Sequence, residues 1–131
     1  LRPERVRGTD IMILRELGGG LYYGEPRADE GKRAYNTMVY TDHEVRRLAR
    51  LAFSLARDRR GRVTSVDKAN VLEVSRLWRE VVNDVARAYA DVTLTHEYVD
   101  AAAMKLAMTP ASSVKPKNGI KSGIASNGLM R

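Results

Sequence analysis

The chain has 131 residues, of which 44% are hydrophobic and 30% are charged, and it contains no cysteine. This length suits one domain with an ordinary hydrophobic core. Without cysteine the chain can form no disulfide, no thiolate zinc site and no cysteine nucleophile. It contains no apolar run of about 18 residues, the minimum for a membrane span. We therefore expect a soluble protein in a cytoplasmic setting.

The formal net charge of +7 is unevenly distributed along the chain. Residues 109–131 contain three lysines and one arginine and no acidic residue, which leaves residues 1–108 with a charge of only +3. That body carries no helix-turn-helix, zinc-finger or aromatic RNA-binding signature. Nucleic acid is therefore not the expected partner, and residues 109–131 are expected to form a basic tail rich in glycine, serine and lysine.

The N-terminal part of the chain favours β-structure. In residues 10–17, four apolar residues follow Asp10 and the segment runs into three glycines, which predicts a buried strand that feeds a tight loop. Arg15 and Glu16 would then lie at the carboxyl end of this strand. Residues 21–40 contain two β-prone segments separated by polar residues, a pattern that predicts a two-stranded arm.

Helices and strands alternate after the arm. Thr41 and Glu44 match a capping box, and the wide apolar stripe behind them predicts a helix. Asn70 is expected to cap a second helix that runs to about Tyr89. The other expected elements are strands at residues 63–66 and 92–99 and a third helix at residues 101–108. This order predicts an α/β fold with a mixed, partly parallel sheet and flanking helices.

Arg15 and Tyr22 are the first candidates for chemistry. Arg15 precedes a run of glycines, where the backbone can approach a ligand closely. A lone arginine, however, more often forms a structural ion pair. Tyr22 is a possible proton donor, although neighbouring aromatic residues in a β-arm usually serve packing.

A second group of candidates follows the later strands. Lys68 and Asn70 lie between a strand and a helix, where α/β proteins build their sites. A lysine beside a carboxylate there could act as a base, and the alternative is a surface loop with an asparagine cap. Asp100 could bind magnesium or manganese, or could simply lie at a helix N-terminus. His43 and His96 lack metal-ligand spacing and are expected to be structural.

Five segments, taken together and in this order, resemble the second domain of the 3-isopropylmalate dehydrogenases, in the isocitrate and isopropylmalate dehydrogenase family. The segments are residues 13–17, 19–27, 65–72, 77–79 and 98–104. The similarity covers about residues 5–108. The sequence Gly-Glu-Pro-Arg at the end of the second segment favours these enzymes over their isocitrate and tartrate dehydrogenase relatives.

The resemblance implies an enzyme that uses NAD and Mg²⁺ or Mn²⁺ to decarboxylate 3-isopropylmalate oxidatively in leucine biosynthesis. It also implies a homodimer, held by the arm and by helices, in which the partner subunit completes each active site. The matched positions would place Asn70 and Val71 near the nicotinamide.

The resemblance assigns roles to four further residues. Arg15 would clamp a malate carboxylate, and Tyr22 would be the acid that protonates the enolate after carbon dioxide leaves. Lys68, from the partner chain, would be the base for the substrate hydroxyl. Asp100, again from the partner, would ligate the divalent metal ion. Positive groups around the site would stabilise the enolate.

Parts of the family pattern have no counterpart in this sequence. The family's first domain, with its adenine-binding loop and paired substrate arginines, is not matched. Residues 109–131 hold no acidic residue where the family has two further metal-binding aspartates. We therefore expect a second-domain fragment at residues 1–108 that is inactive alone. The alternative is a non-catalytic binding module whose basic tail contacts an acidic partner.

Overall fold

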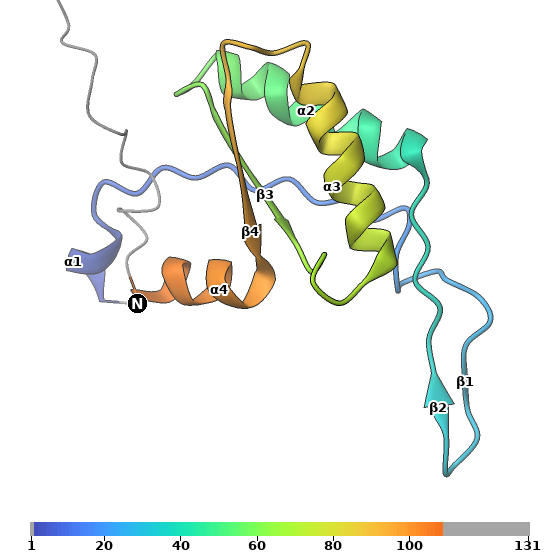
Figure 1. Cartoon of the computed structure of the whole chain (residues 1–131). Coiled ribbons are helices and arrows are strands. Elements are labelled where there is room, and N and C mark those ends of the chain that lie inside the picture. The colour runs from blue at the N-terminus through green and yellow to red at the C-terminus, as the bar shows by residue number, and fades with distance from the viewer. Residues whose placement is uncertain (1, 109–131) are drawn as a thin grey trace, which may run out of the picture.

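The computed structural model describes residues 2–108 (Figure 1). The predicted basic tail at 109–131, and its suggested contact with an acidic partner, lie outside the described residues. The elements in chain order are α1 (Pro3–Val6), β1 (Ala28–Asp29), β2 (Ala34–Tyr35), α2 (Asp42–Arg57), β3 (Arg62–Asp67), α3 (Glu73–Ala86), β4 (Thr93–Tyr98) and α4 (Val99–Met108). Within the described range, no helix combines the length and the apolar character needed to cross a membrane.

The strands β3 and β4 form a parallel pair, in register from Arg62 opposite Thr93 to Asp67 opposite Tyr98. Helix α3 connects them, because parallel neighbours need a crossover. Asp67 is buried on the face of β3 that meets α3, where it receives hydrogen bonds from Arg79. The α/β class with a partly parallel sheet and flanking helices is thereby confirmed.

A capping box starts helix α2, as predicted. The Thr41 hydroxyl oxygen accepts from the backbone N–H of Glu44 at 3.4 Å, and the Glu44 carboxylate accepts from the backbone N–H of Thr41 at 2.8 Å. Two backbone donors that the first turn would leave free are therefore satisfied. The hydrogen bonds to Thr41 also lower the pKa of Glu44 below its ordinary value.

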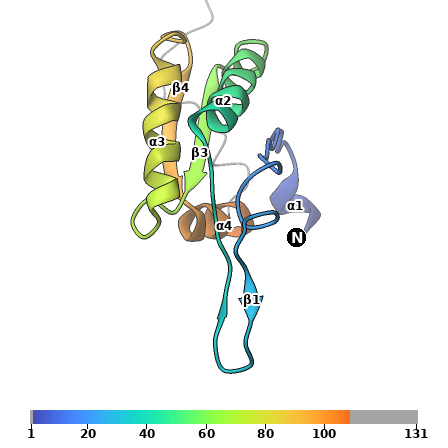
Figure 2. The ribbon, with the colours of Figure 1, turned by 90° about the vertical axis from the view of Figure 1, so that its right-hand side faces the viewer.

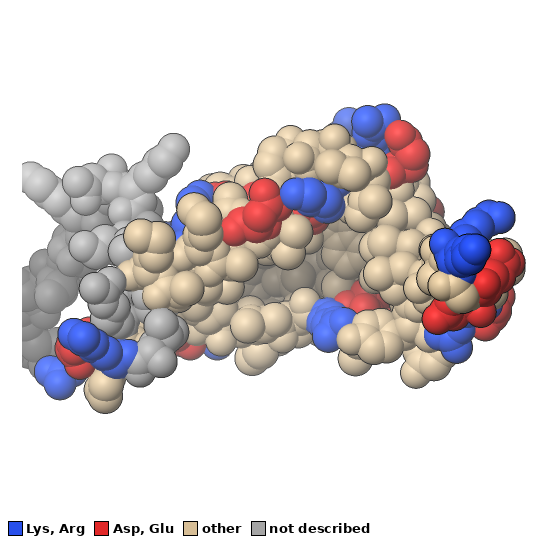
Figure 3. Space-filling view, turned by 90° about the horizontal axis from the view of Figure 1, so that it is seen from below, with Lys and Arg blue, Asp and Glu red and all other residues tan. Residues whose placement is uncertain are grey.

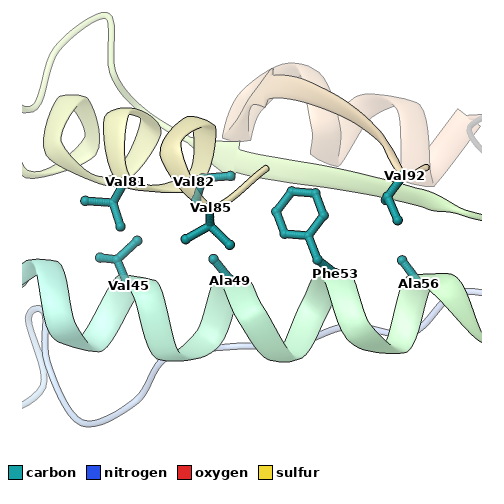
Figure 4. Packing of buried hydrophobic residues seen from close by; sticks show 8 residues of the cluster. All are labelled: Val45, Ala49, Phe53, Ala56, Val81, Val82, Val85 and Val92. Carbon is teal, nitrogen blue, oxygen red and sulfur yellow. The ribbon is translucent and has the colours of Figure 1, made fainter. Parts of the chain in front are cut away.

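The hydrophobic core lies where the apolar stripe of α2 meets α3. Phe53 is fully buried and stacks on Tyr89 with ring centroids 5.2 Å apart. The buried cluster consists of Val45, Ala49, Phe53, Ala56, Val81, Val82, Val85 and Val92 (Figure 4). Both helices also pack against β3. The core therefore holds the strands in place from one side of the sheet.

Residues 21–40 form a narrow arm, and Figures 1 and 2 both show it projecting away from the helices. Strands β1 and β2 pair antiparallel near its tip, and an isolated bridge joins Gly20 to Val39 at its base. A Cβ atom at Gly24 would lie 1.9 Å from the Thr37 carbonyl oxygen, so the two limbs approach too closely for any side chain there. The predicted arm is present, with shorter strands than expected.

The strand predicted at residues 10–17 is wrong for the described structure. The segment is not assigned to a strand, and Ile11, Met12 and Ile13 are exposed. An apolar strand is buried only if neighbouring strands pair with it, and among the described residues β3 pairs with β4 alone. Ion pairs from α2 and the turn after it hold the segment instead: Arg47 binds Glu16 and Arg59 binds Asp10.

The predicted asparagine cap of α3 is also wrong. Asn70 lies in a turn in which the Lys68 carbonyl oxygen accepts from the backbone N–H groups of Val71 and Leu72, both at 2.9 Å. This turn delays the helix, which begins at Glu73 with Leu72 at the N-cap and no side-chain cap. The short helix α1 was not predicted from the sequence.

Candidate active site

Lys68 and Asp100 meet beyond the ends of the two parallel strands. Lys68 directly follows β3, and Asp100 lies in the first turn of α4, two residues after β4 ends. The Lys68 Nζ atom lies 2.6 Å from Asp100 Oδ1. The hydrogen bond from Lys68 is the main reason why the pKa of Asp100 is below its ordinary value. The side chains are 32% and 65% exposed, so a ligand can reach both.

Arg15 and Tyr22 form a second pair at the base of the arm. The Arg15 Nη2 atom donates to the Tyr22 hydroxyl oxygen at 2.8 Å, and its guanidinium carbon lies 5.0 Å from the centre of the tyrosine ring. Arg27 donates to the backbone carbonyl of Tyr22 at 2.9 Å. Because Arg15 occupies a lone pair of the hydroxyl oxygen, the O–H of Tyr22 remains available to donate its proton to another group.

A buried carboxylate anchors the segment that carries Arg15. Glu16 accepts from Arg47 at 2.8 Å and from the backbone N–H of Gly18 at 2.7 Å. The hydrogen bond from Arg47 is the largest cause of the lowered pKa of Glu16. A hollow of about 590 Å³ adjoins this anchor and is lined by Arg15, Glu16, Leu17, Gly18, Arg47, Leu48 and Leu51.

Asn70 and Val71 lie in the turn that links β3 to α3, and both are exposed. The turn places them within three residues of Lys68 in the chain, beyond the end of the sheet where Asp100 also lies. Both residues are therefore open to a ligand that approaches the turn from solvent.

The space-filling view from below shows how charge is arranged on this face of the molecule (Figure 3). The surface is hollowed near the centre of the view, and acidic and basic side chains border the hollow on both sides. The tip of the arm, at the right of the view, also carries both signs of charge.

The described residues supply only part of a metal site. Asp100 offers an exposed, hard carboxylate oxygen of the kind that Mg²⁺ and Mn²⁺ prefer. Within residues 2–108, however, no three His, Cys, Asp or Glu side chains are grouped so that they could hold a metal ion. The described residues therefore offer Asp100 as a single candidate ligand and form no complete metal site.

Three residues support Lys68, and two of them, Arg79 and Ser75, were not predicted as part of the site. Asp67 binds Arg79 through both of its carboxylate oxygens, and the Ser75 hydroxyl oxygen accepts from the backbone N–H of Lys68 at 3.2 Å. The carboxylate beside Lys68 in the sequence is Asp67, but the sequence did not indicate its contact with Arg79. Arg79 and Ser75 lie on α3, and their position at the end of β3 depends on how the helix packs, which no local pattern reveals.

Comparison with known proteins gives the family. A sequence model described as "Isocitrate/isopropylmalate dehydrogenase" matches residues 1–115. The chain belongs to this family. It is 34% identical to the isocitrate dehydrogenase of Methylococcus capsulatus in a crystal structure, with a TM-score of 0.63. That match covers 70% of this chain and 29% of the other.

Curated relatives named 3-isopropylmalate dehydrogenase are more similar in sequence. The protein from Salinibacter ruber is 59% identical over 112 residues, a match that covers 84% of this chain and 30% of the relative. The protein from Parasynechococcus marenigrum is 55% identical over 114 residues, covering 84% of this chain and 32% of the relative. The chain thus spans about a third of the length of the curated relatives it matches.

Proposed function

We propose that residues 1–108 are second-domain sequence of a 3-isopropylmalate dehydrogenase and carry half of its catalytic groups. The observation that carries the proposal is the contact between Lys68 and Asp100 at the carboxyl ends of two parallel strands, where α/β enzymes build their sites. Relatives of that name at 53–59% identity support the same reading. The compartment we propose is the cytoplasm.

In this proposal each side chain has one task. The Lys68 amine, when neutral, accepts the hydroxyl proton while the carbinol carbon loses a hydride. The bond to the carboxylate β to the new carbonyl then breaks, and its electron pair forms an enolate as carbon dioxide leaves. The Tyr22 hydroxyl gives its proton to the enolate carbon, and Arg15 holds the malate carboxylate. These assignments follow general acid–base logic and the resemblance of the five sequence segments to the family.

The cofactors belong to the same proposal. NAD⁺ would accept the hydride, and Mg²⁺ or Mn²⁺ would polarise the hydroxyl and then the carbonyl oxygen. Asp100 would hold the metal ion through one carboxylate oxygen, while Asn70 and Val71 would contact the nicotinamide from the turn beside Lys68. The exposure of these groups is compatible with both roles.

We further propose that the enzyme is a homodimer whose arms pair with each other. A short two-stranded ribbon is marginally stable alone, and this one leaves Leu21, Tyr22, Tyr23 and Val39 exposed. A two-fold symmetric contact would bury the arm against its copy. Lys68 and Asp100 of one chain would then approach Arg15 and Tyr22 of the other, so that two half-sites form one active site.

A segment exchange tests the proposed function. Residues 1–108 replace the matching segment of the Salinibacter ruber relative, and NADH formation from 3-isopropylmalate is followed with Mn²⁺ present. The exchanged enzyme should be active, and Lys68→Ala should lower kcat by about 10²-fold or more, as expected for a general base. Lys105→Ala, which removes a lysine from α4, is the matched control and should retain activity. A folded exchange enzyme without activity, or one insensitive to Lys68→Ala, would contradict the proposal.

A further inference from the structure

Lys68 and Asp100 lie just beyond the ends of β3 and β4, so their relative position depends on how the two strand ends are held. Asp67 and Tyr98 are register partners, and they are the last residues of their strands. Lys68 follows Asp67 directly, and Asp100 follows Tyr98 by two residues. Any group that binds both strand ends therefore also determines how Lys68 lies relative to Asp100.

Arg79 is such a group. Its Nε atom donates to one carboxylate oxygen of Asp67 at 3.0 Å, and its Nη2 atom donates to the other at 2.8 Å. The guanidinium carbon also lies 5.1 Å from the centre of the Tyr98 ring. A planar fork that binds a carboxylate and stacks on an aromatic ring has little orientational freedom. Arg79, which projects from α3, thus ties both strand ends to the helix.

The backbone around Lys68 is held by two buried side chains. Asp67, whose side chain is 2% exposed, accepts from the backbone N–H of Ala69 at 2.9 Å in addition to binding Arg79. Ser75, also buried, accepts from the backbone N–H of Lys68 at 3.2 Å. The two acceptors hold consecutive peptide groups, so the direction in which the Lys68 side chain leaves the backbone is restricted.

We propose that Arg79 is a positioning residue that acts through Asp67 and Tyr98 to hold Lys68 against Asp100. Its importance for catalysis rests on the proposed function, but the geometric claim does not. Arg79 touches neither Lys68 nor Asp100 in the hydrogen bonds described, so its effect is indirect. We call the contact of Arg79 with Asp67 and Tyr98 the Arg79 clamp. Removing this clamp should loosen the two strand ends relative to each other, while the core between α2 and α3 stays intact.

The chain offers a matched control for this clamp. Arg57 donates to both carboxylate oxygens of Asp91 at 2.7 Å, and its guanidinium carbon lies 4.4 Å from the centre of the Tyr89 ring. The same three residue types thus form the same hydrogen bonds and ring contact at the end of α2 and just beyond α3, where neither Lys68 nor Asp100 lies, although the Asp91 side chain is 56% exposed and that of Asp67 only 2%. Removing either clamp deletes the same chemical groups.

Cross-linking of the full 131-residue chain tests the proposal. The chain has no cysteine of its own, so Lys68→Cys and Asp100→Cys introduce the only two thiols, and a short bis-maleimide, which adds one thiol to each of its two rings, reports how often they meet. The clamp is removed by D67N with R79M, a pair of changes that leaves no unpaired charge buried. The control background carries R57M with D91N. Denaturation curves recorded on both backgrounds report any general loss of stability.

Intramolecular cross-linking should slow by about fivefold in the D67N/R79M background, the order expected when one net hydrogen bond of restraint is lost. It should be unchanged in the R57M/D91N background. An unchanged rate without the Arg79 clamp, or an equal fall in both backgrounds, would overturn the proposal. If D67N/R79M failed to fold, R79K would replace it, because lysine keeps the positive charge beside Asp67 but loses the two-pronged contact, and an unchanged rate there would have the same meaning. Cross-linking needs no turnover, so its outcome is independent of the segment-exchange assay.

Discussion

The buried Glu16 should contribute measurably to stability, and Glu16→Gln tests this contribution with little change in shape. The carboxylate accepts from Arg47 at 2.8 Å and from the backbone N–H of Gly18 at 2.7 Å, with a side-chain exposure of only 4%. A glutamine at this position keeps an acceptor oxygen for Gly18 but loses the charge that pairs with Arg47. The substitution therefore isolates the charged component of the contact.

The expected loss follows from the contacts. A hydrogen bond to a charged group contributes about 1.5–3 kcal/mol and a neutral one about 1 kcal/mol, so Glu16→Gln should lower the free energy of unfolding by about 1–2 kcal/mol. For a domain of this size each kcal/mol corresponds to a fall in Tm of roughly 4–8 °C. Glu25→Gln makes the same change in the exposed ion pair with Arg27 and should cost about 0–1 kcal/mol.

The contribution of Glu16 should also depend on pH. Because Arg47 lowers the pKa of Glu16 below its ordinary value of 4.5, this stabilisation is fully present above about pH 4.5. It is lost as the pH falls through the lowered pKa of the folded state. The difference in stability between the parent and Glu16→Gln, measured by urea denaturation, should therefore be constant at neutral pH and shrink in acid. A parent and variant of equal stability at neutral pH would refute the reasoning.

Two further predictions concern the core and the activity. Phe53→Ala should lower the free energy of unfolding by about 3–5 kcal/mol, because the fully buried ring stacks on Tyr89 and leaves a cavity. Phe53→Leu should cost less than half of that in the same denaturation assay, and a loss below about 1 kcal/mol for the alanine variant would contradict the packing. The 131-residue chain alone should form no NADH from 3-isopropylmalate with Mn²⁺, because its described residues supply only one proposed metal ligand. NADH formation by chain of verified mass, free of host enzyme, would overturn this expectation.

Features encoded locally could be predicted from the sequence. The capping box of Thr41 and Glu44 starts α2 where expected, because both hydrogen bonds join residues three apart in the chain. The apolar stripe behind it was sufficient to place Phe53 in the core. A partly parallel sheet was predicted from the alternation of strands and helices, and the parallel pairing of β3 with β4 across α3 confirms it, since parallel neighbours need such a crossover.

Features that depend on distant neighbours could not be predicted. Residues 10–17 have the composition of a buried strand, but strand formation needs a pairing edge that the described residues do not provide. Asn70 has a strong preference for helix caps, yet the turn closed by the Lys68 carbonyl places Leu72 at that position. The contact of Arg79 with Asp67 forms only when α3 packs on β3. The two residues are twelve positions apart and lie on different elements, so no local sequence pattern indicates their contact.

The exposure of the two candidate pairs bears on how a complete site would be assembled. Under the proposed function, an enolate must form and be protonated by Tyr22, and electrostatic stabilisation of such an anion is strong only where water is excluded. Tyr22 is 56% exposed, and the Asp100 side chain is 65% exposed. A hydrogen bond orients Arg15 against Tyr22, and another orients Lys68 against Asp100. Neither pair is shielded from water. Covering both requires surfaces from outside residues 2–108, which is why a second subunit and the remaining two thirds of the relatives' length enter the proposal together.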